Sequence, residues 1–517
     1  MRSVFGNRGA PAMTAAPGTL PRRKKTFFDK IAYGFGSVAY GVKDNGFQVL
    51  LLLYYNQALG LAASAVGFAV MIALICDAIS DPIIGRMSDN LRSRWGRRHP
   101  FMYAAALPVA ISYYFLWNPP AGLQGDGLFY YLLFLMIAIR TFITFYEIPS
   151  SALVVDMTED YDERTSFLSF RYFFGWVGGL TMAVAAFSVF LRPSPEYPNG
   201  QLNLEGYSLY GLTASLIMLT AIVVSAVGTH RHIPTFRPTP PKEPFVLSKS
   251  AREIFATLTF KPFMIMLGAT FFAYAAAGVA GSILTYFRIY FWELTGDQIS
   301  ILLFGNFASV FIALFLAPRV ASRIGKKPAA ILFAVLTIFM SPLAYIGRLL
   351  GVLPENGDPM LVVILFSTSF IGTILSMSSG VIGSSMIADI VEDYASRTRK
   401  FSAGLFFSAN SFVLKSLSGV GVFGAGLILD FVSFPEGAEV GSVPQSVLTD
   451  MALVEIPVLA SLQVISLLFV LAYPISRIRH EQNLREIAAQ DEAREAAAEM
   501  QAVESEDARN PTGRAIV

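Results

Sequence analysis

The chain has 517 residues, of which 54% are hydrophobic and 15% charged, and its formal net charge is +2. So few charged residues in a chain of this length exclude an ordinary soluble protein and indicate many membrane spans. The near-neutral charge gives no support for nucleic-acid binding. The single cysteine excludes disulfides and CxxC sites, and the four histidines are too scattered for a metal cluster.

The predicted elements form two groups of six helices. Residues 1–30 are polar, carry a basic run at 22–25, and are expected to be a tail without a cleavable signal. Stretches long enough to cross about 30 Å of hydrocarbon follow. In a first half, residues 31–228, helices are predicted at 31–57, 62–86, 100–117, 128–151, 166–191 and 209–228. A polar, basic linker, residues 229–260, precedes a second half, residues 261–475, with helices predicted at 261–291, 296–318, 328–347, 360–388, 402–432 and 451–475. Residues 476–517 are expected to be a tail with a helical stretch at 477–509.

The loops alternate between basic and acidic along the chain. The basic set includes 92–98, the linker and 319–327, whereas the opposite set carries few bases and several acids. The positive-inside rule therefore predicts that the basic loops and both termini are cytoplasmic, in a multi-pass protein of the cell (inner) membrane.

A repeated motif supports two similar halves. The pattern D-x-x-E-D-Y-x-x-R-T runs from Asp156 to Thr165 and again from Asp389 to Thr398, each time shortly after a Ser-Ser pair. This agreement predicts a transporter built from parallel repeats. We expect ion pairs with a gating role at charged positions of the repeat, among them Asp156, Asp160, Arg164, Asp389, Asp393 and Arg397.

Two acids in the second predicted helix are the strongest candidates for a functional site. Asp77 and Asp81 are four residues apart, so they share one helix face. Acids inside a membrane span are costly and mark ion or substrate pathways. The pair can share a proton or hold Na⁺. The alternative is that Asp81, next to Pro82, only bonds local backbone at a kink.

Lys415 lies deep in the eleventh predicted helix and needs an anionic partner there. Asp77 or Asp81 from the other half is the natural candidate, and such a bridge would couple ion occupancy to the arrangement of the halves. The alternative is a lysine whose side chain reaches the membrane surface.

Further charged residues interrupt the apolar spans of the first half and are candidates for substrate binding. They are Lys43, Asp44, Arg140, Glu147 and Arg171. Lys43 and Asp44 could pair with each other, and Arg171 is a candidate partner for Glu147. Pro149, two residues after Glu147, is expected to break its helix and free backbone groups to line a cavity. The alternative is structural ion pairing between helices.

The basic loop after the second helix is expected to have a gating role. Asp89 can pair with arginines of this loop, such as Arg94 or Arg97, which would hold the cytoplasmic side closed. Orientation of the loop by charge alone is the alternative and is compatible with this pairing. Gly325-Lys326-Lys327-Pro328 resembles Gly96-Arg97-Arg98-His99-Pro100 in the first half.

These motifs resemble a known family. D-A-I-S-D-P-I-I-G at 77–85, R-S-R-W-G-R-R at 92–98, Glu147-Ile148-Pro149 and Lys415 are similar to the glycoside–pentoside–hexuronide:cation symporters, the melibiose-permease-like branch of the major facilitator superfamily. The resemblance implies an all-α membrane protein with the major-facilitator fold, twelve transmembrane helices in two six-helix halves. It also implies that Asp77 and Asp81 bind Na⁺, Li⁺ or H⁺, that Lys415 takes part in coupling, and that Asp44, Glu147 and Arg171 bind sugar.

The chain departs from the melibiose carrier in its substrate residues. Ser151 and Gly380 replace tryptophans that could stack on sugar, Glu147 is one methylene longer than the family's acid, and Arg140 has no counterpart and points to an anionic substrate. The carriers of lysolipids look similar around the helix-two acids and Lys415.

We expect a cation-coupled symporter of a glycoside or related sugar or uronate that works by alternating access. The alternatives are a cation-coupled carrier of an amphipathic lipid or other organic anion, and a transporter-shaped sensor that moves nothing. No nucleophile–base or metal set indicates an enzyme. The expected partners are the solute, a coupling Na⁺ or H⁺ with no further cofactor, and membrane lipid, around a monomer.

Overall fold

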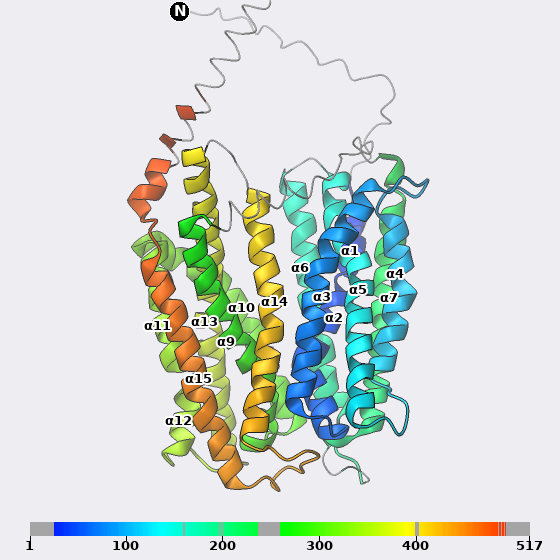
Figure 1. Ribbon diagram of the computed structural model, residues 1–517, viewed down its shortest axis with the longest axis vertical. Coiled ribbons are helices and arrows are strands. Elements are labelled where there is room, and N and C mark those ends of the chain that lie inside the picture. The colour runs from blue at the N-terminus through cyan, green and yellow to red at the C-terminus, as the bar shows by residue number, and fades with distance from the viewer. Residues whose placement is uncertain are drawn as a thin grey trace, which may run out of the picture.

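The computed structural model describes residues 25–158, 161–195, 197, 200–235, 259–398, 403–483, 485–486, 489–490 and 492. Within these residues all regular structure is helical, and long helices stand side by side in two groups that follow one another in the chain (Figure 1). The side chains of Lys415 and several of its neighbours, and all of Asp160, lie outside the described residues.

The first group contains six spans. The first is interrupted and consists of α1 (Phe27–Phe35), α2 (Val38–Gly46) and two π-helical turns, η1 (Phe47–Leu51) and η2 (Tyr54–Ala58). The others are α3 (Ala63–Asn90), α4 (His99–Leu116), α5 (Gly125–Met157), α6 (Tyr161–Ala185) with η3 (Ala186–Phe190), and α7 (Leu204–His230). Short 3₁₀ turns, η4 (Gly200–Leu202) and η5 (Ile233–Thr235), precede and follow α7.

The second group also contains six spans. They are α9 (Lys261–Tyr286) with η6 (Phe287–Phe291), α10 (Gly296–Ile324), α11 (Lys326–Met340) with α12 (Leu343–Leu349), α13 (Pro359–Thr398), α14 (Ala403–Phe431) and α15 (Gln445–Ala472). Among the described residues, nine helices are long and apolar enough to cross a membrane by themselves. The interrupted first span, α4 and α14 complete the predicted set of twelve.

A close backbone contact explains where the first span breaks. At Gly36, between α1 and α2, a Cβ atom would overlap the Tyr146 hydroxyl and would lie 2.6 Å from the Ser225 Cβ. Only glycine fits this position, and its low helix propensity favours an interruption of the helix there. The sequence predicted a membrane-spanning stretch at 31–57, and the chain crosses there as two helices and two π-helical turns rather than as one helix.

Pro149 does not break α5, contrary to the prediction from Glu147-Ile148-Pro149. The helix runs from Gly125 to Met157 with the proline inside it. The Ser150 hydroxyl donates to the Glu147 carbonyl at 3.1 Å, and the Ser151 hydroxyl donates to the Ile148 carbonyl at 2.9 Å. Such side-chain hydrogen bonds are a known means of accommodating proline in membrane helices.

The two halves meet most extensively along α3 and α14, which lie side by side in Figure 1. A Cβ at Gly67 would lie 2.5 Å from the Phe423 Cα, and one at Gly419 would lie 2.8 Å from the Met71 Cα. Glycines at these points let two backbones approach closely, as small residues do between membrane helices. The two helices are antiparallel, because partner positions on α3 rise as those on α14 fall.

Hydrogen bonds join the halves at the end of the bundle opposite the basic loops. The Tyr286 hydroxyl donates to the Asn56 side chain at 2.8 Å, and the Gln57 amide donates to the Pro435 carbonyl at 3.1 Å. The Ala438 amide N–H donates to the Gln57 side-chain oxygen at 3.0 Å. These groups are buried, so each hydrogen bond resists separation of the halves at this end.

Candidate transport site

Asp77 and Asp81 converge on one hydroxyl of the neighbouring helix α5. The Thr144 Oγ1 lies 2.9 Å from the Asp77 Oδ1 and 3.1 Å from the Asp81 Oδ1. Asp77 is only 5% exposed. The two acids therefore share a face of α3, as their spacing predicted, and that face is turned toward α5.

The Thr144 hydroxyl cannot donate to all of its neighbours. Its oxygen also lies 2.9 Å from the Arg140 carbonyl, so three acceptor oxygens surround a group that has a single hydrogen. Close contact between the hydroxyl oxygen and a carboxylate is favourable only if a proton or another cation lies between them. This arrangement can therefore hold a proton on one carboxyl group, or a small cation among the oxygens.

Arg140 belongs to this cluster. Its Nη1 lies 3.5 Å from the Asp77 Oδ2, and its guanidinium lies 5.4 Å from the centre of the Phe47 ring. The guanidinium balances one of the two carboxylates, which leaves these three side chains with one negative charge. One bound monovalent cation would neutralise that charge. The predicted substrate-binding role of Arg140 remains a prediction.

Position 415 is at the same level as the two acids, although the Lys415 side chain lies outside the described residues. The contacts between α14 and α3 pair position 423 with 67 and position 419 with 71. One further turn of this antiparallel register pairs position 415 with position 75, which is two residues from Asp77. The predicted bridge between the halves is compatible with this backbone register and remains a prediction.

The predicted substrate residues other than Arg140 form two groups, Lys43 with Asp44 and Arg171 with Glu147. The Lys43 ammonium lies 2.9 Å from the Asp44 carboxylate, so these two residues pair with each other as predicted, and Asp44 is 59% exposed. Arg171 on α6 donates to the Ser150 hydroxyl at 3.1 Å and to the main-chain carbonyl of Glu147 at 3.4 Å. The predicted partner of Arg171 was the Glu147 side chain, whereas the contact found is with its backbone.

Aromatic rings surround the Arg171 guanidinium. It lies 5.1 Å from the centre of the Tyr40 ring and 6.0 Å from that of Tyr33, both on the interrupted first span. Cations held in this way over aromatic rings are stabilised without a carboxylate. Arg171, Tyr40 and Glu147 thus bring donors, an apolar ring and a carboxyl group to the junction of three helices, as recognition of a polyhydroxylated solute requires.

The basic loop of the first half binds the repeat acid Asp156 at the end of α5. The Arg97 Nη2 lies 2.5 Å from the Asp156 Oδ1, and the Arg98 Nε lies 2.6 Å from its Oδ2. The hydrogen bond with Asp156 raises the pKa of Arg97 above its usual value. Asp89 pairs with Arg98 at 3.3 Å, so it contacts an arginine of this loop as predicted, although Arg94 and Arg97 were the examples given. Gly96, with φ of 72°, provides the turn that directs Arg97 and Arg98 toward α5.

The second half repeats this arrangement with different bases. The Lys326 Nζ lies 2.5 Å from the Asp389 Oδ1, and Gly325 before it again has a positive φ, of 92°. Asp393 pairs with Arg397 at 2.7 Å. All the ion pairs described so far in both basic loops lie within one half. The gating role of these residues stays a prediction.

Arg164, another charged member of the repeat, contacts a backbone group. The Arg164 Nη2 donates to the Thr158 carbonyl at 3.3 Å, across the start of α6. Asp160 lies outside the described residues.

A pocket of about 620 Å³ lies between the halves at the end opposite the basic loops. Its charged lining residues are Arg192, Glu293, Asp297 and Glu439. The predicted substrate-binding residues do not line it, so it is distinct from the cluster around Asp77 and from the junction around Arg171.

Sequence reasoning missed Thr144, Arg98 and Ser150. Thr144 lies four residues after Arg140 and three before Glu147, so helical spacing put it on the face that carries both charges. Threonine and serine are common in membrane helices, and their hydroxyls gave no comparable signal. Arg98 is one of four arginines in a short loop, so its charge alone did not distinguish it from the others.

The comparisons with known proteins all indicate transporters of one family. A model of the family described as MFS/sugar transport protein matches residues 32–477. The putative glycoside/cation symporter YagG of Escherichia coli is 25% identical over 81% of this chain and 86% of its own length. The sphingosine-1-phosphate transporter MFSD2B of Mus musculus is 24% identical over 79% of this chain and 82% of its own.

Solved structures agree on the fold. The inward open conformation of the xylose transporter XylE from E. coli superposes with a TM-score of 0.58, at 15% identity, over 89% of this chain and 98% of that chain. At this identity the likeness shows the fold alone. It confirms the predicted major-facilitator arrangement of two six-helix halves.

Proposed function

Since the chain belongs to the MFS/sugar transport protein family, the one indicated by its resemblance to glycoside–pentoside–hexuronide:cation symporters, we propose that it is a cation-coupled symporter of a glycoside or related sugar or uronate. The observation that carries the proposal is the cluster in which Asp77 and Asp81 share the Thr144 hydroxyl. Two carboxyl groups around a hydroxyl that has one hydrogen for three acceptor oxygens are suited to binding one proton or one Na⁺.

The solute is proposed to bind between the halves, next to Arg171, Tyr40 and Glu147. The guanidinium and the carboxyl group can bond to hydroxyls of a sugar, and the tyrosine ring can pack on its apolar face. The similarity to a putative glycoside/cation symporter supports this choice of solute. The guanidinium of Arg171 would also suit the carboxylate of a uronate.

Binding of cation and solute would change the arrangement of the halves. A hydrogen bond accepted by Asn56 from Tyr286 and one donated by Gln57 to Pro435 join the halves at the end that the positive-inside rule predicts to be extracellular. Lys415 on α14 is at the level of the two acids of α3. The incoming cation would displace its ammonium from the carboxylate that it binds. Alternating access then follows if these bonds break when both ligands are bound.

Uptake by proteoliposomes tests the proposal. A panel of glycosides, uronates and lysolipids would be offered with Na⁺ and pH gradients imposed separately. We expect one sugar class to be concentrated only when one of the two gradients is present. In Asp81→Asn and Asp77→Asn, uphill uptake should be lost while the protein stays folded. Concentration of the solute at the wild-type rate by either variant would contradict the coupling role.

A carrier of amphipathic lipid is the second candidate. The similarity to a sphingosine-1-phosphate transporter over most of the chain favours it. The same panel separates the two, because uptake of a lysolipid without uptake of any sugar would support this candidate and overturn the first. Counterflow of either solute would exclude a sensor that moves nothing.

A further inference from the structure

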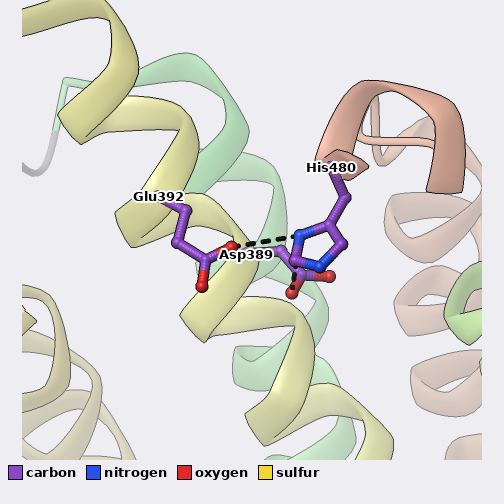
Figure 2. Close-up of side chains that lie close together, drawn as sticks. All are labelled: Asp389, Glu392 and His480. Carbon is purple, nitrogen blue, oxygen red and sulfur yellow. Dashed lines mark ion pairs between the residues drawn. The ribbon is translucent and has the colours of Figure 1, made fainter. Parts of the chain in front are cut away.

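The segment after α15 folds back onto the end of α13. Residues 477–483 are helical. The Arg479 Nε lies 3.0 Å from the Asp393 Oδ1, and the Asn483 amide donates to the same oxygen at 3.2 Å. These contacts hold the next residue, His480, over the last turns of α13, as Figure 2 shows.

His480 and two acids of α13 bring three possible metal ligands together. The His480 Nδ1 lies 3.1 Å from the Glu392 Oε2 and 3.5 Å from the Asp389 Oδ1 (Figure 2). One ligand atom from each residue lies within 4.8 Å of the others. Ligand atoms about 2.0–2.1 Å from a tetrahedral Zn²⁺ are separated by roughly 3.3 Å. The three side chains are therefore spaced as ligands of one ion.

Two of these atoms lack other partners. The His480 Nδ1 and the Glu392 Oε2 are inaccessible to solvent and have no hydrogen bond to any described group, although they lie 3.1 Å apart. A hydrogen on the nitrogen does not point at the oxygen. The lone pair of an unprotonated nitrogen takes that same direction, beside the Glu392 oxygen, and a metal ion bound to both atoms likewise lies off the line that joins them.

Other charges near the cluster limit its affinity. The Lys326 Nζ lies 2.5 Å from the Asp389 Oδ1 and neutralises that carboxylate, and an incoming metal ion has to displace it. The Lys326 side chain is 34% exposed, so its ammonium can move into water. Asp393 on the same helix is already paired with Arg397 and Arg479 and adds no free charge.

We propose that Asp389, Glu392 and His480 form a binding site for a divalent transition-metal ion of the Zn²⁺ type, with water as the fourth ligand. One imidazole and two carboxylates suit Zn²⁺, Co²⁺ or Mn²⁺. Two ligands come from α13 and one from the C-terminal helix, so the ion fastens that helix to the second half. Displacement of Lys326 also frees the basic loop before α11. The site is independent of the proposed transport function.

Titration of the full-length, detergent-purified protein with Co²⁺ tests the proposal, since tetrahedral Co²⁺ absorbs visible light strongly. We expect one Co²⁺ per chain, displaced by Zn²⁺. In His480→Ala and Glu392→Gln the affinity should fall roughly tenfold or more. Glu481→Gln, an exposed change on the same helix, is the matched control and should bind normally. Lys326→Gln should bind more tightly than the wild type.

Absence of Co²⁺ binding by the wild type, or equal binding by His480→Ala, would overturn the metal site. Limited trypsin digestion provides a second measurement. Zn²⁺ should slow cleavage at Arg477 and Arg485 in the wild type and in Glu481→Gln, but not in His480→Ala. If cleavage is faster in His480→Ala and insensitive to Zn²⁺ in every variant, the cluster is an ion pair only and the proposal fails.

Discussion

The Arg140 guanidinium lies 3.5 Å from the Asp77 carboxylate, beside the hydroxyl that Asp77 shares with Asp81. A permanent positive charge next to a proposed cation site opposes the binding of a second positive charge there. The repulsion acts on a proton as well as on Na⁺, because both carry one unit of charge. Arg140 is therefore expected to lower the affinity of this cluster for its coupling cation.

Replacing Arg140 with glutamine should change the ion dependence of uptake. At about 5 Å and an effective dielectric constant of about 20, the repulsion of a unit cation is about 3 kcal/mol, or roughly a hundredfold in affinity. We therefore expect the half-saturating concentration of the coupling cation, Na⁺ or H⁺, to fall by up to about a hundredfold in Arg140→Gln. Arg140→Lys keeps the charge and is the control. Unchanged ion dependence in Arg140→Gln would contradict this role.

The Thr144 hydroxyl should be needed for cation affinity and not for folding. Thr144→Val removes the oxygen that contacts both carboxyl groups and keeps the shape of the side chain, whereas Thr144→Ser keeps the oxygen. Loss of one hydrogen bond to a charged group costs about 1.5–3 kcal/mol. The half-saturating concentration of the coupling cation should rise at least about tenfold in Thr144→Val and little in Thr144→Ser. A similar rise in both variants would indicate disturbed packing instead.

Sequence predicted the pairing of Asp77 with Asp81 because helical periodicity alone places residues four apart on one face. It could not predict that this face turns toward Thr144, since that depends on how α3 and α5 are aligned. For the same reason Arg140 was assigned to an anionic substrate. Its contact with Asp77 depends on tertiary packing, and the seven-residue spacing to Glu147 gave no hint of it.

The internal repeat was a better guide to contacts than local charge. It related Gly96-Arg97 to Gly325-Lys326, and both basic residues bind the first acid of their own repeat. Local charge predicted an arginine of the loop for Asp89 without distinguishing one from another, and the partner is Arg98, which also binds Asp156. A repeat reports tertiary structure that two halves have in common, whereas charges within one loop can pair in several ways.

The two equivalent acids should differ in their contribution to stability. Asp156 is buried against two guanidinium groups, one of them itself buried, whereas Asp389 binds one partly exposed ammonium. Removing one partner of a buried ion pair costs about 3–5 kcal/mol, and the cost is smaller where one member, here the Lys326 ammonium, is partly exposed. Asp156→Asn should therefore lower the melting temperature in detergent clearly more than Asp389→Asn, when both are measured with a chelator present. Equal effects would mean that Lys326 binds as strongly as the two arginines together.

Stability should also depend on pH through the contact that joins the end of α7 to α1. The buried Asp29 carboxylate, 1% exposed, lies 2.6 Å from the His232 Nε2. The Lys25 Nζ lies 2.9 Å from the other ring nitrogen, so the ring is neutral and carries its hydrogen on Nε2. Burial lowers the pKa of His232 below its ordinary value of 6.5, although Asp29 opposes the shift.

A histidine whose pKa is lower in the folded state makes folding less favourable in acid. As the pH falls below about 6.5, the unfolded chain binds a proton that the folded chain resists, so stability decreases. We expect the melting temperature to fall between pH 7.5 and 5 by an amount equivalent to about 1 kcal/mol. His232→Gln, which keeps a donor toward Asp29 without a titrating group, should lose less over this range. An identical fall in both proteins would exclude His232 as the cause.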